Sequence, residues 1–179
     1  MANKEDRINK LKAANELSHS ITSKKIKEAL YKMLEKKNIN EIKVTDLIKQ
    51  AGVSRGTFYK HYYYVSDILK EDLDELINNI VNNLTPSLFS NWLLVFNQVY
   101  EHREKLAFVY KAGLSLTLLK KVNEYFKDKE NKDLYIIWNG IAFNAVYNWG
   151  VNGFRKSPER LAKEMTKTTK IFFENKITT

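Results

Sequence analysis

The sequence predicts an all-α protein, and three observations support this. Apolar residues recur at the spacing of one helix face along nearly the whole chain. No stretch shows the alternation typical of a strand. Glycine occurs six times and proline twice in 179 residues, which is too few for the many turns of a sandwich or a barrel. We therefore expect about nine helices.

The first expected helix covers residues 23–37 and presents one apolar face. That face consists of Ile26, Leu30, Met33 and Leu34. Residues 1–22 form an N-terminal extension with two interpretations, a weakly amphipathic helix or a loose basic arm. Residues 38–43 are expected to form a short connection.

Residues 44–62 have the pattern of a helix–turn–helix. A short helix over 45–51 is expected to end at Gly52, because glycine tolerates the left-handed backbone at a helix C-terminus. Ser54 is expected to cap a second short helix over residues 55–62.

Apolar side chains fix which face of the second short helix points outward. Val53 and Phe58 are expected to fill the angle between the two helices. Arginine can donate two hydrogen bonds to guanine in the major groove, and threonine or tyrosine can reach a phosphate. The backbone N–H groups at the start of this helix can also bind phosphate. The outward residues are Arg55, Thr57, Tyr59, Lys60 and His61.

The net charge of +9 is concentrated near the N-terminus. Residues 1–65 contain 14 basic and 7 acidic residues, residues 66–130 contain 8 and 10, and residues 131–179 contain 8 and 4. This excess favours a polyanionic partner for the N-terminal part. A solvated lysine-rich surface is the alternative interpretation.

Composition argues against several classes of function. There are no cysteines, and the three histidines at 19, 61 and 102 are far apart, so we expect no metal site, no cofactor and no catalytic residue. The protein is therefore not expected to be an enzyme. The most apolar run, 135–149, contains three asparagines, so no membrane association is expected. The N-terminus has no apolar signal core, which suggests a cytoplasmic protein.

Six further helices are expected after the helix–turn–helix. Pro86 interrupts the chain between the first two of them, and Ser157 followed by Pro158 is a strong helix start. The six ranges are 66–83, 88–101, 103–111, 115–127, 133–153 and 158–175.

The segment Ala51–Tyr62, AGVSRGTFYKHY, closely resembles the recognition segment of the tetracycline-repressor (TetR) family of bacterial transcription regulators. The resemblance extends over about residues 23–80. It implies a homodimer with a DNA-binding domain at 23–65 and a helical effector-binding and dimerisation domain at 66–179. It also implies a sequence-specific repressor that an effector releases from a palindromic double-stranded operator.

The same resemblance implies roles for individual residues. Thr45 corresponds to a phosphate contact, and Arg55, Gly56 and Tyr59 correspond to groove-facing positions. The full DNA-binding set is Thr45, Ser54, Arg55, Gly56, Thr57, Tyr59, Lys60 and His61. Two departures stand out. Ile48 occupies a position where the family often has alanine, and Val65 one where many members have a phosphate-binding lysine.

The C-terminal part resembles a domain of regulators from low-GC Gram-positive bacteria, a group that includes a dihydroxyacetone-kinase-regulator-like branch. The matching segments are 136–143, 149–154 and 157–162. The resemblance implies that the last two helices pair across a twofold axis. The interface residues expected are Ile141, Ala145, Trp149, Leu161, Met165 and Phe172.

Aromatic residues are frequent after residue 88 and have two interpretations, an effector pocket or a packed core. The pocket candidates are Trp92, Phe96, Tyr100, Phe108, Trp138, Phe143 and Tyr147. Two alternatives to an effector-released repressor stay open. One is a DNA-binding co-regulator whose C-terminal domain binds a protein partner, and the other is a helical interaction protein with no DNA role.

Overall fold

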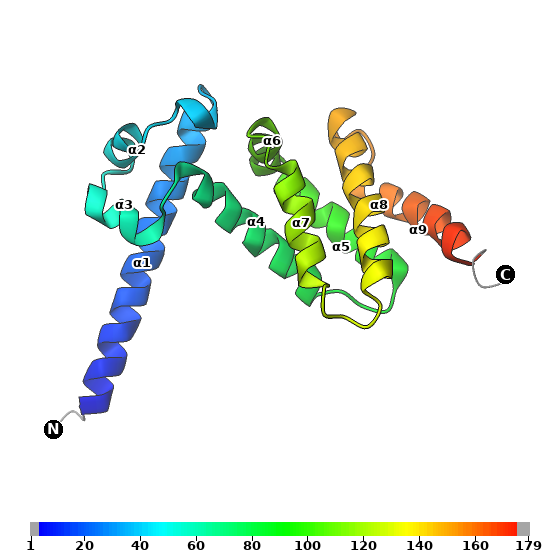
Figure 1. The fold of residues 1–179 in the computed structure, drawn as a ribbon, viewed down its shortest axis with the longest axis horizontal. Coiled ribbons are helices and arrows are strands. Elements are labelled where there is room, and N and C mark those ends of the chain that lie inside the picture. The colour runs from blue at the N-terminus through cyan, green and yellow to red at the C-terminus, as the bar shows by residue number, and fades with distance from the viewer. Residues whose placement is uncertain (1–3, 175–179) are drawn as a thin grey trace. The chain divides into compact units, whose positions relative to one another are not determined.

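The computed structural model describes the backbone of residues 4–174 and the side chains of residues 5–170. Within this range the chain forms nine α-helices, one short 3-10 helix and no strand, which confirms the predicted all-α class (Figure 1). The helices are α1 (Lys4–Leu34), α2 (Val44–Ala51), α3 (Arg55–His61), α4 (Val65–Asn82), α5 (Leu88–Glu101), α6 (Arg103–Lys111), α7 (Ser115–Tyr125), α8 (Lys132–Val151) and α9 (Pro158–Glu174).

The chain divides into two compact units, Met1–Glu71 (unit 1) and Asp72–Thr179 (unit 2). The division falls inside α4. None of the helices described is long and apolar enough to cross a lipid bilayer.

Helix α1 is longer than the sequence analysis expected. The prediction that it starts at residue 23 is wrong, because residues 4–22 continue the same helix. The physical reason is the high helix propensity of this stretch, which has no glycine or proline and is rich in lysine, glutamate, alanine and leucine. Every residue from 5 to 21 is exposed, so burial does not stabilise this part of the helix.

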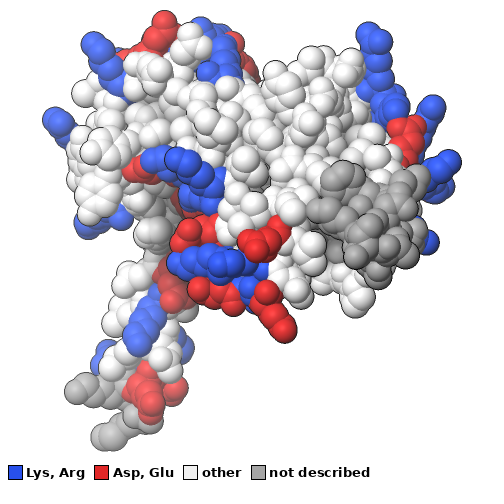
Figure 2. All heavy atoms as spheres, turned by 45° about the vertical axis from the view of Figure 1, so that its right-hand side comes forward, with Lys and Arg blue, Asp and Glu red and all other residues white. Residues whose placement is uncertain are grey.

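The exposed part of α1 is not a basic arm. Residues 5–22 contain three basic and three acidic residues. Figure 2 shows this mixture on the part of α1 that projects at the lower left.

Unit 1 contains the helices α1, α2 and α3 (Figure 1), and its small apolar core comes from their buried side chains. Ile26 and Leu30 of α1 and Phe58 of α3 are fully buried. The Tyr62 hydroxyl, just after α3, lies 2.7 Å from the Ser23 hydroxyl of α1. The core and this hydrogen bond together hold the helix–turn–helix against the C-terminal half of α1.

Unit 2 is organised around the packing of α5 along α9. Trp92 of α5 is fully buried and stacks on Phe96 at a centroid distance of 5.4 Å. The indole N–H of Trp92 donates to the hydroxyl of Thr169, which is also buried, at 3.2 Å. Helix α7 packs along α8.

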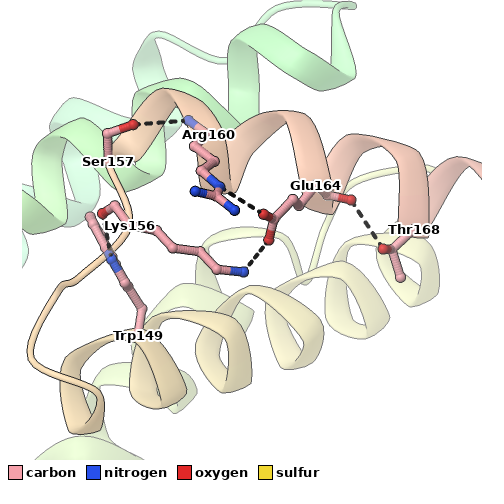
Figure 3. Close-up of polar contacts among 6 residues, drawn as sticks. All are labelled: Trp149, Lys156, Ser157, Arg160, Glu164 and Thr168. Carbon is pink, nitrogen blue, oxygen red and sulfur yellow. Dashed lines mark hydrogen bonds and ion pairs between the residues drawn. The ribbon is translucent and has the colours of Figure 1, made fainter.

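The turn from α8 into α9 is fixed by polar contacts (Figure 3). The Trp149 indole N–H donates to the carbonyl of Lys156 at 3.0 Å, and the ammonium of Lys156 pairs with Glu164. The hydrogen bond from Lys156 lowers the pKa of the Glu164 carboxyl. Ser157 accepts a hydrogen bond from the Arg160 N–H at 3.3 Å, which confirms it as the predicted cap of α9.

Candidate nucleic-acid interface and internal cavities

The turn between α2 and α3 has the geometry predicted for it. Gly52 adopts φ 66° and ψ 35°, in the left-handed region. The Val53 N–H donates to the Ile48 carbonyl at 3.0 Å, which closes the end of α2. A Cβ added at Gly52 would have no atom within 4 Å, so glycine is needed here for its backbone conformation alone.

Ser54 caps α3, as predicted. Its hydroxyl accepts a hydrogen bond from the Thr57 N–H at 3.0 Å and lies 2.7 Å from the Thr57 hydroxyl. These bonds leave Thr57 half-buried and directed back along its own helix.

The outer face of α3 is defined by the side chain that the helix buries. Phe58 is fully buried, whereas Arg55, Tyr59 and Lys60 are exposed. The Arg55 guanidinium lies 5.7 Å from the centre of the Tyr59 ring, so the two side chains share one surface. Gly56 lies between them in sequence and is also exposed.

The helix–turn–helix carries further exposed cations on α2 and just before it. Lys43 precedes α2, and Lys49 lies in its last turn. Neither these two lysines nor Arg55 and Lys60 form an ion pair with another described residue. Thr45, at the start of α2, is exposed as well. The helix–turn–helix therefore presents uncompensated positive charge together with hydroxyl and guanidinium donors.

His61 has a partner that the sequence did not indicate. Its ring stacks on that of His19 in α1, at a centroid distance of 3.8 Å and an angle of 28°. Its Nδ1 atom is buried and has no hydrogen-bond partner. Burial lowers the pKa of His61, the nearby His19 lowers it further, and Glu71 acts in the opposite direction. His61 thus belongs to α3 and is also in contact with α1.

The segment after α3 carries two exposed tyrosines. Tyr63 and Tyr64 have exposed fractions of 78% and 70%. Helix α4 begins at Val65, and the Asp67 carboxylate accepts a hydrogen bond from the Tyr64 N–H at 2.8 Å. The segment just before α4 therefore presents two exposed phenol side chains.

Unit 2 contains an apolar cavity of about 100 Å³, here called the inner cavity. Its walls come from α4 to α8, and none of the described side chains that line it is charged. Two of the predicted pocket residues, Trp138 and Phe143, line it. Asn139 also lines it; this residue is buried and its amide donates to Asn123 at 3.2 Å.

A second space of about 280 Å³, here called the outer groove, lies between α8 and the α5–α6 pair. Of the predicted pocket residues, Tyr147 lines this groove. The other four, Trp92, Phe96, Tyr100 and Phe108, line neither space. Trp92 and Phe96 are fully buried in the core, and Tyr100 is partly exposed beside Arg103.

A third hollow, about 610 Å³, lies between α8 and α9. Five of the six predicted dimer residues line it: Ile141, Ala145, Trp149, Leu161 and Met165. The side chain of the sixth, Phe172, lies outside those that the structure describes. Asn144 and Asn148 also line this hollow, and the Asn148 amide donates to the Asn144 carbonyl at 3.0 Å.

The predicted site residues include neither His19 nor Arg103, and Tyr110 is counted only among the aromatic residues that follow residue 88. Arg103 and Tyr110 line the outer groove, and Tyr110 also lines the inner cavity. Within the described residues, no group of three or more acidic or histidine side chains is arranged to hold a metal ion.

Comparison with known proteins gives one partial family match. Residues 5–90 match a family of unknown function, DUF6262. No curated protein matches the chain in sequence.

Solved structures with a similar fold cover most of the chain. Lin0861 from Listeria innocua has a TM-score of 0.72 at 12% identity, over 87% of this chain and 93% of that one. A TetR transcriptional regulator from Streptococcus agalactiae 2603V has a TM-score of 0.57 at 18% identity, over 87% and 97%. The fatty acid degradation regulator FadR from Bacillus halodurans has a TM-score of 0.52 at 19% identity, over 82% and 93%. At these identities the comparisons show a shared fold.

Proposed function

We propose that the protein is a sequence-specific DNA-binding transcriptional regulator of the TetR type. The observation that carries the proposal is the α2–turn–α3 unit. Phe58 and the Ser54 cap fix α3, so that Arg55, Gly56, Tyr59 and Lys60 form one exposed face. Such a helix fits the major groove, with its N-terminal residues on base edges. The shared fold with a TetR transcriptional regulator supports this proposal.

Two substitutions separate base reading from phosphate contact. Arg55→Ala should weaken binding to the selected site by about 1–3 kcal/mol and relax specificity at one base pair, because the two hydrogen bonds that the guanidinium donates to a guanine are lost. Lys60→Ala should weaken binding to all sequences alike and reduce the salt slope by about 1, because a phosphate loses its counterion.

The experiment selects binding sites from a random duplex library with the full chain and then measures anisotropy over a range of salt concentrations. Lys129→Ala is the matched control, since Lys129 is an exposed lysine on the α7–α8 connection. If no sequence is enriched, or if Arg55→Ala and Lys129→Ala behave alike, the proposal is refuted.

We further propose that the protein is a homodimer through α8 and α9. The hollow between them is lined by the apolar side chains of Ile141, Ala145 and Met165, which are only partly buried in one chain. A second copy would cover them and place two α3 helices on a palindromic duplex.

Ala145→Glu tests this arrangement, because it places a charge in the proposed interface. The mass from light scattering should fall from twice the chain mass to the chain mass. Leu116→Glu is the control, since Leu116 of α7 is 66% exposed. A wild-type monomer would contradict the proposal, and so would an Ala145→Glu dimer as tight as that of the wild type.

The repressor action is the third part of the proposal. A small molecule bound in unit 2 would favour a conformation that does not fit the operator, and so release the DNA. The inner cavity and the outer groove are the spaces in which we expect it to bind.

A further inference from the structure

The inner cavity and the outer groove are neighbours that share one wall. Four side chains line both of them: Val99, Leu106, Tyr110 and Val146. Three of these are aliphatic and can shift by rotation, and the fourth brings a hydroxyl to the boundary. The two spaces are therefore adjacent, with these four side chains between them.

The inner cavity suits the uncharged part of a ligand. Among the described lining residues, Asn139, Tyr110 and Trp138 carry polar side-chain groups, and the Asn139 amide already donates to Asn123 at 3.2 Å. A carboxylate or an ammonium placed there would lose its hydration without gaining an ionic partner. An alkyl chain or an apolar ring has no charge to desolvate there, and its transfer into the cavity buries apolar surface.

The outer groove differs because it contains one cation. Arg103, at the start of α6, is the single charged residue among the described residues that line it. The guanidinium is held in place, because Nη1 donates to the Tyr100 carbonyl at 2.7 Å and the group lies 4.5 Å from the centre of the Tyr100 ring. A fixed guanidinium loses little freedom when an anion binds.

Arg103 keeps donors to spare. The guanidinium has five N–H bonds, of which the Tyr100 carbonyl occupies one. The nearest carboxylate, Glu104, is 3.9 Å away with its side chain 87% exposed, and an ion pair in such contact with water is weak. A carboxylate arriving in the groove can therefore take a bidentate pair with Arg103.

Two phenols bring hydroxyl groups to the same groove. The rings of Tyr110 and Tyr147 lie 6.1 Å apart, and both line the groove. Burial raises the pKa of Tyr110, and the neighbouring Tyr147 raises it further, so the Tyr110 hydroxyl keeps its proton at neutral pH. It can donate to an anion and does not repel one.

We propose that the outer groove and the inner cavity form one binding site for a monocarboxylic acid with an apolar chain. The carboxylate lies on Arg103, with the hydroxyls of Tyr110 and Tyr147 beside it, and the chain extends past Val99 and Val146 into the inner cavity. The assignment of this acid as the effector rests on the proposed function, whereas the binding site itself does not.

Calorimetry with the full chain tests the site without DNA. The probes are octanoate, hexanoate and 1-octanol. Octanoate should bind more tightly than hexanoate by about fourfold for each methylene that is buried. It should also bind at least about tenfold more tightly than 1-octanol, which lacks the charge for Arg103.

Three variants locate the two ends of the ligand. Arg103→Gln should weaken octanoate at least about tenfold and leave 1-octanol unchanged. Arg7→Gln, on the exposed part of α1, is the charge-matched control and should change neither. Ala142→Leu fills the inner cavity from its buried wall and should weaken octanoate more than hexanoate. Circular dichroism establishes whether each variant is folded. If Ala142→Leu does not fold, the comparison of octanoate with hexanoate on the wild-type protein still tests the inner cavity.

Several outcomes would overturn the proposal. They are the absence of octanoate binding to the wild type, equal affinity for octanoate and 1-octanol, and a folded Arg103→Gln variant that binds octanoate as the wild type does. Octanoate that binds but leaves the operator complex intact would support the site and refute effector release. The two proposals can therefore fail separately.

Discussion

Replacing Gly52 by alanine tests how strongly the helix–turn–helix depends on one backbone conformation. Gly52 has φ 66° and ψ 35°, and an added Cβ meets no atom within 4 Å. The effect therefore comes from the left-handed backbone alone, which costs an alanine about 1–2 kcal/mol. The lower entropy of the unfolded alanine chain offsets about 0.4–1 kcal/mol of this. We expect Gly52→Ala to lower the free energy of unfolding by about 1 kcal/mol.

Gly140→Ala is the matched control and should have the opposite sign. Gly140 lies inside α8 without a positive φ, and its added Cβ also meets nothing within 4 Å. Alanine in a helix interior is more stable than glycine by about 0.5–1 kcal/mol. The same chemical change should thus destabilise at one position and stabilise at the other.

Urea unfolding followed by two probes makes the comparison. Far-ultraviolet circular dichroism reports all helices, whereas tryptophan fluorescence reports unit 2, because Trp92, Trp138 and Trp149 all lie there. Gly52→Ala should shift the dichroism transition to lower urea. A Gly52→Ala protein as stable as the wild type would refute the reasoning. Equal losses for both variants would show that something other than the backbone dihedral is responsible.

Two further predictions concern named side chains. Thr169→Val should lower the free energy of unfolding in urea by about 1–3 kcal/mol, because it leaves the buried Trp92 N–H without its acceptor. Thr169→Ser keeps the hydroxyl and should lower it less. Equal losses for the two variants would contradict this role of the hydroxyl. Burial holds the pKa of His61 in the folded protein below its ordinary value of 6.5. Just below pH 6.5 the unfolded chain therefore binds more protons than the folded one. The free energy of unfolding of unit 1 should consequently fall as the pH drops through about 6.5. His61→Gln should flatten this pH dependence, and an unchanged slope would assign it to other groups.

Local signals in the sequence were enough to predict most helix ends. Gly52, Ser54 and Ser157 each act through atoms of their own or an adjacent turn, and each has the predicted cap geometry. The interior of the helix–turn–helix was equally predictable. The buried Phe58 is fixed by its spacing from the turn, and its burial decides which residues face outward.

The residues that line the cavities could not be predicted in the same way. Trp92 and Trp138 both lie in apolar helical segments of the sequence, yet Trp92 is in the core and Trp138 lines the inner cavity. The difference depends on how α5, α8 and α9 pack, which no single helix specifies. The stacking of His19 on His61 likewise depends on where α1 crosses α3. For residues 1–22 the sequence left a helix and a basic arm both open, because this half of α1 has helix propensity but no buried face.

That exposed half of α1 has a consequence for how the helix opens. Its backbone hydrogen bonds follow one regular geometry from Lys4 to Leu34, but only the C-terminal half is held by buried side chains such as Ile26 and Leu30. Residues 5–18 are all exposed, so local opening of this part uncovers no buried side chain, and its amide protons should exchange orders of magnitude faster than those around Leu30. A single helix can thus contain a rapidly fraying segment and a cooperatively protected one, and the change between them should fall near His19.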